Sequence, residues 1–305
     1  MKWEKKGLIY CPNGQHGYDL HSFMTPSALL IEEDVIRIWG GVRDEKGVSR
    51  ITYIDVEAKN PKHILAISNK PALDIGNDGC FDDNGVILGD VIRVGSDYYM
   101  YYVGFQHVAK VKFCAFTGLA ISKDGGRSFK RYSEAPILDR SDKARYIRAL
   151  HTVIYDGNIF KAWYAIGNRW ECIDGIPYPS YNIWYLESKD GINFSNKDTH
   201  LCIHNQNNEY RIGRPKVYKR HQKYQMFYTR DFIPKDYVIG YAESIDGKIW
   251  ERRDELVGIS KSSDGWDSEM ACYPVLLEYN EKVYMFYNGN GMGKTGVGYA
   301  ELVEE

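Results

Sequence analysis

Four segments of this chain read almost alike, and their spacing constrains the fold more than any other feature of the sequence. They are rich in Tyr, Phe and Met and recur about every sixty residues: "YYMYYVG" from Tyr98, "FKAWYAIG" from Phe160, "KYQMFYTR" from Lys223 and "KVYMFYNG" from Lys282. Self-similarity at a fixed period indicates a repeat architecture. We therefore expect one structural unit written several times.

A second repeated signal defines the rest of each unit. "GLAISKDGGRSF", "IWYLESKDGINF" and "IGYAESIDGKIW" share a strand that ends in Ser, then Asp-Gly and an aromatic residue. Asp-Gly favours hairpins because both residues tolerate positive φ. Asp also hydrogen-bonds its own turn backbone, so we interpret these as structural turns rather than catalytic sites, at Asp124, Asp190 and Asp246. We expect the aromatic residues that follow to pack between units: Phe129, Phe194 and Trp250.

The predicted fold class is all-β, and the predicted architecture is a five-bladed β-propeller formed by residues 1–305 as a single domain. A further strand precedes each pair ("SALLIEE", "NGVILGDVIRV", "LHTVIYD", "RPKVYKR" and "YPVLLEY"), which gives five units of three or four strands. A four-stranded sheet repeated radially is a propeller blade. The last unit lacks its outer strand, and we expect the N-terminal "WEKKGLIY" to replace it and close the ring. Stacked sandwiches are the alternative, but they do not explain the period.

Composition excludes several classes of protein. The net charge of −2 gives no basic footprint for nucleic acid, and no run of about eighteen apolar residues predicts a membrane span. The six cysteines are scattered without a CxxC pair, so neither a metal site nor another cofactor is expected. "MKWEKKGLIY" has no apolar stretch typical of a signal peptide, which predicts a cytoplasmic protein. A chain trimmed of its leader would read the same.

The ends of the predicted inner strands differ from unit to unit, although the strands themselves repeat. "YDLHSFMTP", "DGCFDDNGV", "RYIRALHTV", "EYRIGRP" and "WDSEMACYP" precede the inner strands, and "GGVRDE", "VGFQH", "IGNRW", "YTRDF" and "NGNGMG" follow the second strands. These ends would meet at one mouth of the central channel. Divergence into carboxylates, Arg, His and Asn at that mouth is expected where similar walls contact one asymmetric ligand.

The five-unit layout, with "FDDNGV", "RPKVY...QMFYTRD" and "WDSEMACYP...YMFYNGN", resembles the five-bladed glycosidase superfamily, which includes glycoside hydrolase families 43 and 32 and the family 130 mannoside phosphorylases. The resemblance implies glycoside cleavage by two carboxyl groups in the channel. Asp83 in "DDNG" looks like the acidic residue that opens an inner strand in that superfamily. Asp44 in "VRDE" and Asp231 in "TRDF" both resemble its stabilising aspartate. The candidates for a general acid are Glu171, Glu209 and Glu269.

Basic and aromatic residues complete the predicted site. Arginine binds phosphate or carboxylate through paired hydrogen bonds, and the arginines at the channel ends exceed what a neutral sugar requires, although each alone is also a partner for a nearby Asp. We predict a catalytic set of Asp83, Asp44, Glu209 and Glu269. The predicted substrate-binding set is Arg43, His21, Arg148, His151, Arg214, Arg230, Asp231, Trp170, Asp267 and Asn288.

The sequence thus predicts a glycoside hydrolase that acts on an oligo- or polysaccharide, with a carbohydrate as its partner. Two alternatives stay open: a phosphorylase or transferase with an anionic co-substrate such as phosphate or an activated or acidic sugar, and a non-catalytic carbohydrate-binding propeller. Lectin propellers usually repeat one site in every blade, and these strand ends differ. A protein-interaction scaffold would leave the concentration of carboxylates and arginines unexplained.

Overall fold

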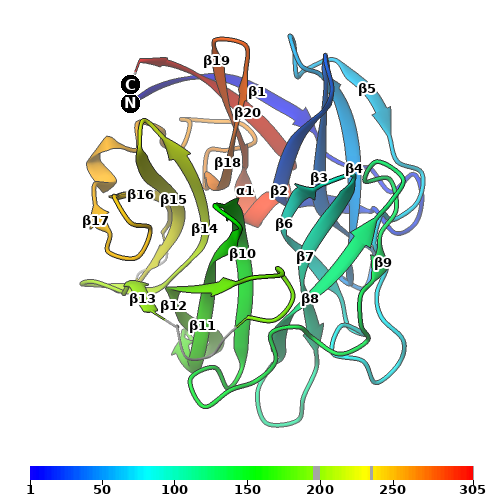
Figure 1. Ribbon diagram of the computed structural model, residues 1–305, viewed down its shortest axis with the longest axis vertical. Helices are drawn as coiled ribbons and strands as arrows, with labels where there is room; N and C mark the ends of the chain where they lie inside the picture. Colours follow the sequence, from blue (N-terminus) through cyan, green and yellow to red (C-terminus); the bar gives the residue numbers. More distant parts are fainter. Residues whose placement is uncertain (195–199, 234–235, 305) are drawn as a thin grey trace.

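A computed structural model describes residues 1–194, 200–233 and 236–304, and these residues form an all-β fold, as predicted. Successive antiparallel runs lie around a common middle, with β2, β6, β10, β14 and β18 innermost (Figure 1). The first runs contain β2 (His21–Glu32), β3 (Val35–Arg43), β4 (Ser49–Glu57), β5 (Ile64–Ile67), β6 (Val86–Val94), β7 (Asp97–Gln106), β8 (Cys114–Ser122) and β9 (Lys130–Arg131). The middle runs contain β10 (Ile147–Asp156), β11 (Ile159–Ile173), β12 (Ile176–Ser188), β13 (His200–Ile203), β14 (Glu209–Arg220), β15 (Lys223–Phe232), β16 (Tyr237–Ser244) and β17 (Glu251–Arg252).

The two ends of the chain meet in one sheet. The last run is β18 (Cys272–Tyr279), β19 (Lys282–Asn288) and β20 (Val297–Glu304), and β1 (Lys2–Tyr10) pairs antiparallel with β20 as its fourth strand. The runs β2–β5 and β14–β17 each form a separate four-stranded sheet. The runs β6–β9 and β10–β13 are joined by a two-residue parallel contact between β8 and β10, so they count as one sheet.

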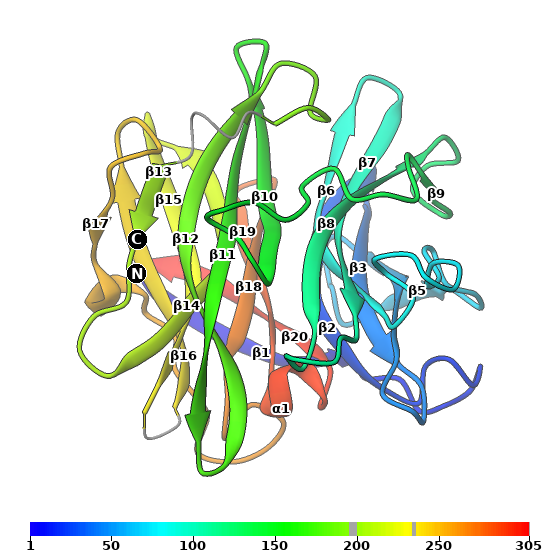
Figure 2. The same cartoon turned by 90° about the horizontal axis from the view of Figure 1, so that it is seen from below.

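Helical structure is minor in the part of the chain that the structure describes. It comprises the 3-10 turn η1 (Asp254–Leu256) and α1 (Asn290–Gly293), in which Gly291 and Met292 have positive φ. No helix among the described residues is long and apolar enough to cross a membrane. In Figure 2 the long β11–β12 hairpin reaches further than the neighbouring strands at the end of the molecule where α1 lies.

The repeated aromatic strands hold successive runs together. They form β7, β11, β15 and β19, each the second strand of its run. The indole of Trp163 in β11 donates a hydrogen bond of 2.8 Å to the carbonyl of Gly247, in the Asp-Gly turn of the following run. The same contact joins Trp39 to Gly126 at 2.9 Å, and the hydroxyl of Tyr101 to Gly191 at 2.9 Å. In the first three runs, an aromatic residue of the second strand therefore bonds the turn of the following run.

The Asp-Gly turns are structural, as predicted. Asp124 accepts hydrogen bonds from the hydroxyls of Ser122 and Ser128 and from backbone N–H groups of its own turn. Burial alone would raise the pKa of Asp124, but these hydrogen bonds lower it to about 2. The aromatic residues after the turns pack against the preceding run, at 6.3–6.4 Å between ring centroids: Phe129 on Trp39, Phe194 on Tyr101 and Trp250 on Trp163.

Every inner strand carries a β-bulge at a similar level. The register with the second strand slips by one residue in each run, at Thr25–Pro26, Gly89, His151, Arg214–Pro215 and Tyr273–Pro274. Thr25, Arg214 and Tyr273 have positive φ of 51–52°, which costs about 1–3 kcal/mol for a non-glycine residue. A β-bulge changes the direction in which nearby side chains point. We call these positions the bulge ring, because they surround the middle of the molecule.

A buried carboxylate ties four inner strands together directly beyond the bulge ring. Asp90 of β6 accepts a hydrogen bond of 3.1 Å from the Ser27 hydroxyl of β2 and one of 3.0 Å from the Val153 N–H of β10. It also forms a 2.6 Å ion pair with Lys216 of β14. Both charged side chains are nearly inaccessible to solvent. This cluster closes the middle of the molecule and gives the cavity above it a rigid floor.

Candidate functional site

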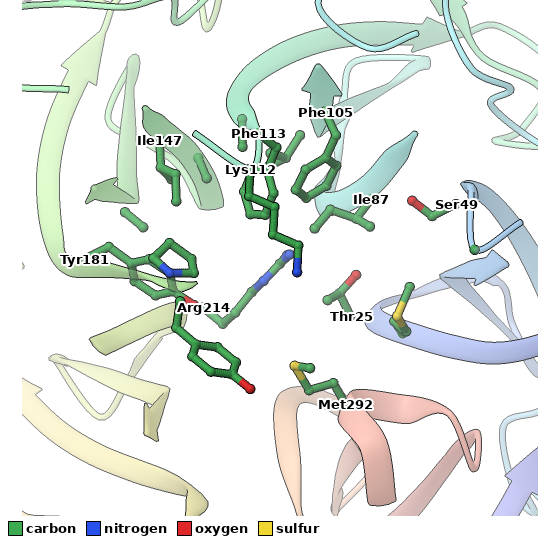
Figure 3. A pocket seen from close by; sticks show the side chains of 18 of the residues that line it. Thr25, Ser49, Ile87, Phe105, Lys112, Phe113, Ile147, Tyr181, Arg214 and Met292 are labelled. Carbon is green, nitrogen blue, oxygen red and sulfur yellow. The ribbon is translucent and has the colours of Figure 1, made fainter. Parts of the chain in front are cut away.

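A cavity of about 510 Å³ lies above the bulge ring, a typical size for a small-molecule site. Its floor includes Thr25, His151, Arg214 and Tyr273 of the bulge ring. Its walls come from the inner strands, the second strands, the loop between β7 and β8, the β11–β12 hairpin and α1. Arg214 and Lys112 point toward its centre from two different runs (Figure 3).

Every charged side chain that lines this cavity is basic. The lining contains Arg43, Lys112, Arg211, Arg214 and Lys294, and it contains His21, His107 and His151. Among the residues that the structure describes, no Asp or Glu lines it. The site therefore offers many hydrogen-bond donors and few acceptors, and its electrostatics favour an anion.

Arg214 is held in position from below. Its guanidinium donates a 2.8 Å hydrogen bond to the Leu88 carbonyl and lies 3.3 Å from Nδ1 of His151. Burial, together with the charges of Arg214 and Lys216, lowers the pKa of His151 well below its usual value. His151 is therefore a neutral imidazole at pH 7, and its Nδ1 accepts from Arg214. The ring of Tyr273 packs on the same guanidinium, 5.4 Å away.

Arg211 also lines the cavity, but its charge is paired. It forms a salt bridge of 2.7 Å with Asp231, which also accepts a hydrogen bond from the Tyr210 hydroxyl. Asp231 lies behind Arg211 and is itself buried. Asp231 was predicted to bind the substrate. In this geometry its carboxylate instead positions Arg211, which lines the cavity.

Three buried polar atoms of the cavity lining have no hydrogen-bond partner among the described residues. They are Nε of Arg43, the indole nitrogen of Trp170 and the hydroxyl oxygen of Thr25. Buried polar groups are almost always paired, so each such atom needs an explanation. Their position on two different runs around one cavity indicates that a ligand or water satisfies them. His21 lies nearby, bonded to Ser22 at 2.7 Å.

The four predicted catalytic carboxylates are not brought together. Asp44 pairs with Arg50 at 2.8 Å and accepts from the N–H groups of Lys46 and Val48, so it fixes the β3–β4 turn. Glu269 is exposed in the loop before β18. Neither lines the cavity.

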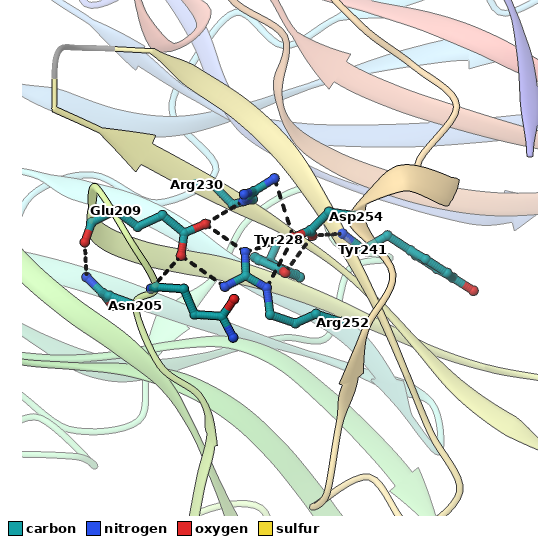
Figure 4. Close-up of polar contacts among 8 residues, drawn as sticks. Asn205, Glu209, Tyr228, Arg230, Tyr241, Arg252 and Asp254 are labelled. Atoms are coloured by element: carbon teal, nitrogen blue, oxygen red, sulfur yellow. Dashed lines mark hydrogen bonds and ion pairs between the residues drawn. The ribbon is translucent and has the colours of Figure 1, made fainter.

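Glu209 belongs to a separate ion network (Figure 4). Its carboxylate accepts hydrogen bonds of 2.6–2.9 Å from Arg230 and Arg252, and Arg252 also pairs with Asp254 at 2.7 Å. Burial alone raises the pKa of Glu209, but these bonds outweigh it and leave the pKa below its usual value. A general acid needs the opposite shift. The geometry gives Glu209 and the predicted binding residue Arg230 a structural role.

Asp83 lies at the edge of the cavity. It follows the fully buried Asp82, which pairs with Arg131 at 2.8 Å and braces the loop, and it precedes Asn84, which lines the cavity. One carboxylate oxygen of Asp83 accepts from the Gly79 N–H at 3.0 Å. The other oxygen is buried and has no partner among the described residues. Asp44 also follows a lining residue, Arg43, but both of its oxygens have partners, so among the four predicted carboxylates only Asp83 combines such a position with a buried oxygen that lacks a partner among the described residues.

The remaining predicted residues divide between the cavity and the framework. Arg43, His21, His151, Arg214 and Trp170 line the cavity. Three others make framework contacts instead: the buried Arg148 donates to the Asp139 carbonyl, Asp267 pairs with Lys5, and the amide of Asn288 bonds the backbone of Phe23, Thr25 and Gly296. Asn288 thereby fixes the strand segment that carries Thr25.

Sequence reasoning missed several lining residues, and one signal could have found some of them. Tyr273 precedes Pro274 just as Thr25 precedes Pro26 and Arg214 precedes Pro215, so a repeated X-Pro marks the bulge in three inner strands. Proline inside a strand favours a bulge. Lys112 lies in the loop between β7 and β8, and Lys294 follows α1. Neither position belongs to the repeated pattern, so no sequence signal marks these two lysines.

Comparison with known proteins gives both a relative and a fold. No family model matches the chain. It is 32% identical over 304 residues, 99% of each chain, to "Uncharacterized protein Rv1502" of Mycobacterium tuberculosis strain H37Rv. A solved "Glycoside hydrolase" aligns with a TM-score of 0.77 at 19% identity, covering 99% of this chain and 92% of that one.

Two further solved structures share the fold. A thermostable family-43 glycoside hydrolase aligns with a TM-score of 0.72 at 18% identity, covering 93% of this chain and 90% of that one. A structure from a study of the GH130 family of mannoside phosphorylases, which contains hydrolases of β-1,2 mannosidic linkages, aligns at 0.71 and 13% identity, covering 98% and 93%. These neighbours are β-propeller glycosidases, so the predicted likeness to that superfamily is confirmed at the level of fold.

Proposed function

This chain belongs to the family of Rv1502, and we propose that it transfers a glycosyl group in its central cavity with phosphate, or the phosphoryl group of an activated sugar, as the anionic co-substrate. One observation carries the proposal: the charged residues that line the cavity are basic, and no carboxylate lines it among the described residues. The fold is shared with glycoside hydrolases and with a family of mannoside phosphorylases, which supports carbohydrate chemistry.

The lining favours phosphate as a reactant over cleavage by two protein carboxylates. Hydrolysis of that kind needs an acid and a base or nucleophile on opposite sides of the bond. In phosphorolysis a phosphate oxygen attacks the anomeric carbon and the glycosidic C–O bond breaks. The leaving oxygen takes a proton from an acid, and the products are a sugar 1-phosphate and an alcohol. The protein then has to supply one acid and a set of cations.

We assign these roles to residues at the cavity. Arg214, Arg43 and Lys294 come from different elements and would surround the phosphoryl oxygens, for which arginine has suitable geometry. Asp83 is our candidate for the acid because it precedes the lining residue Asn84 and one of its carboxylate oxygens is buried without a partner among the described residues. Trp170 and Tyr181, on the β11–β12 hairpin, would contact the sugar.

We also propose that the antiparallel runs form a five-bladed ring closed by β1. The pairing of β1 with β20, the contacts from β3, β7 and β11 to the turn of the following run, and the Asp90 cluster across four inner strands support this arrangement. A ring of this kind places the bulge ring around one axial cavity.

The test is product analysis with and without phosphate. The protein is incubated with a panel of disaccharides and with sugar 1-phosphates plus acceptor sugars, and products are separated by chromatography. We expect turnover only when phosphate or a sugar phosphate is present, and we expect Arg214→Gln and Asp83→Asn to abolish it. Release of free sugar at an unchanged rate without phosphate would refute the proposal and favour hydrolysis.

A further inference from the structure

The cavity has two unlike halves. One half carries the basic side chains around the bulge ring. The other half is formed by an apolar cluster that packs around the cavity itself rather than between runs, including Met24, Ile87, Val103 and Ile147. In Figure 3 Ile87, Phe105, Phe113 and Ile147 lie on one side of the cavity, with Met292 opposite.

Apart from the indole nitrogen of Trp170, the apolar half offers almost nothing to a sugar hydroxyl. Its strand residues are aliphatic, and alanines at positions 115, 149 and 165 keep the wall recessed. A hydroxyl placed against such a wall loses its hydrogen bonds to water without gaining others. The part of a ligand that fills this half therefore carries carbon rather than hydroxyl groups.

Aromatic rings complete the same half. Phe105 at the end of β7, Phe113 before β8 and Trp170 in β11 form a chain of edge-to-face contacts, with ring centroids 5.0–5.1 Å apart. All three rings line the cavity and are only half-buried. Phe113 follows Lys112, so one loop supplies a cation to the centre of the cavity and a ring to its apolar wall.

The volume leaves room for both parts of such a ligand. At roughly 30 Å³ per water molecule, 510 Å³ corresponds to about 17 waters. A phosphoryl group at Arg214 and Lys112 would occupy a small part of that space. The remaining space extends toward Phe105, Phe113 and Ile147.

We infer that the ligand is amphiphilic: a phosphoryl-bearing head lies among Arg214, Lys112 and Arg43, and an aromatic or hydrocarbon group bonded to that head lies against Phe105, Phe113 and Ile147. This inference rests on the proposed function for its anionic half and adds the apolar half. It makes the physiological partner a phosphate-linked apolar glycoside or donor rather than a fully hydroxylated oligosaccharide.

The experiment compares three probes by isothermal titration calorimetry on the full chain: inorganic phosphate, glycerol phosphate and phenyl phosphate. We expect phenyl phosphate to bind at least tenfold more tightly than glycerol phosphate, which has a polar group of similar size. Phe113→Ala and, independently, Ile147→Ser should reduce that preference to less than threefold while the affinity for inorganic phosphate changes less than twofold. Tyr132→Ala, a change to an exposed aromatic residue, is the matched control.

The outcomes separate this inference from the function on which it rests. Equal affinity for phenyl and glycerol phosphate overturns the apolar half and leaves the anionic site intact. A preference for phenyl phosphate that survives both Phe113→Ala and Ile147→Ser overturns the assignment of the wall. Failure of all three probes to bind overturns the anionic head and, with it, the proposed function. Arg214→Gln should weaken all three probes together.

Discussion

Replacing Asp90 with Asn tests whether the buried cluster beneath the cavity holds the inner strands together. Asn preserves the shape of the side chain, and its single amide oxygen can still accept from either the Val153 N–H or the Ser27 hydroxyl, which bond different oxygens of Asp90. It removes the charge opposite Lys216, whose ammonium lies 2.6 Å from the carboxylate. Burial lowers the pKa of Lys216, and Asp90 is the carboxylate that opposes this effect.

The expected loss is large because a buried charge is left without its partner. Breaking a buried ion pair from one side costs about 3–5 kcal/mol, whereas replacing both partners with neutral groups is often neutral. We therefore expect Asp90→Asn to lower the free energy of unfolding by about 3–5 kcal/mol. Adding Lys216→Met should restore at least about 2 kcal/mol of it.

Urea unfolding followed by tryptophan fluorescence measures both changes in a double-mutant cycle. Asp264→Asn, at an exposed loop position, is the matched control and should change stability by less than about 0.5 kcal/mol. A loss below about 1 kcal/mol for Asp90→Asn, or additive effects of the two changes, would refute the idea that the pair acts as a unit.

Three further changes test other parts of the argument. Trp163→Phe removes one of the two indole hydrogen bonds to the Gly247 carbonyl, which keeps the bond from Trp250, and should cost about 0.5–1.5 kcal/mol in urea unfolding; an unchanged midpoint would contradict the role of the repeat. Gly104→Ala places a Cβ 2.6 Å from the Phe81 ring and should destabilise the protein without adding a polar group, as thermal unfolding would reveal by a lower Tm than that of Gly41→Ala, whose Cβ would meet its neighbours at 3.5 Å or more. Glu209 has a lowered pKa, so its stabilising contribution is present above the unfolded pKa of roughly 4.3 and is lost as pH falls. Glu209→Gln should therefore flatten the acid limb of stability against pH, and an equally steep limb would count against the ion network.

The repeat made the framework readable from sequence, because periodic residues have periodic contacts. Trp39, Tyr101 and Trp163 occupy the same place in three copies, and each donates to the turn of the next copy. The Asp-Gly turns were readable for the same reason: the Asp and Ser side chains bond within four residues of themselves. Hydrogen bonds between residues so close in sequence can be predicted without knowing the tertiary structure.

The site was less readable, because the partner of a carboxylate is set in three dimensions. The sequence places Glu209 at an inner-strand start, but Arg252, 43 residues further on, folds back and neutralises it. Asp231 follows Arg230 in sequence, yet it pairs with Arg211 on the neighbouring strand. The arginines were predicted as a group, because their number exceeds what a neutral sugar needs. That prediction does not depend on which carboxylate each arginine pairs with, and Arg43 and Arg214 do line the cavity.

The framework and the cavity also differ in how charge is compensated. In the framework, carboxylates and arginines are matched: Asp90 with Lys216, Glu209 with Arg252, Asp231 with Arg211. Of the cationic side chains that line the cavity, Arg211 is paired with Asp231, whereas Arg43 and Arg214 form no ion pair among the described residues, and the strained backbone of three non-glycine residues lies beneath a space with no acidic lining. Cations without a paired carboxylate in such a cavity are unfavourable without a counterion. The folded protein therefore gains stability from an anion, and its Tm should rise with phosphate concentration more steeply than with chloride at equal ionic strength.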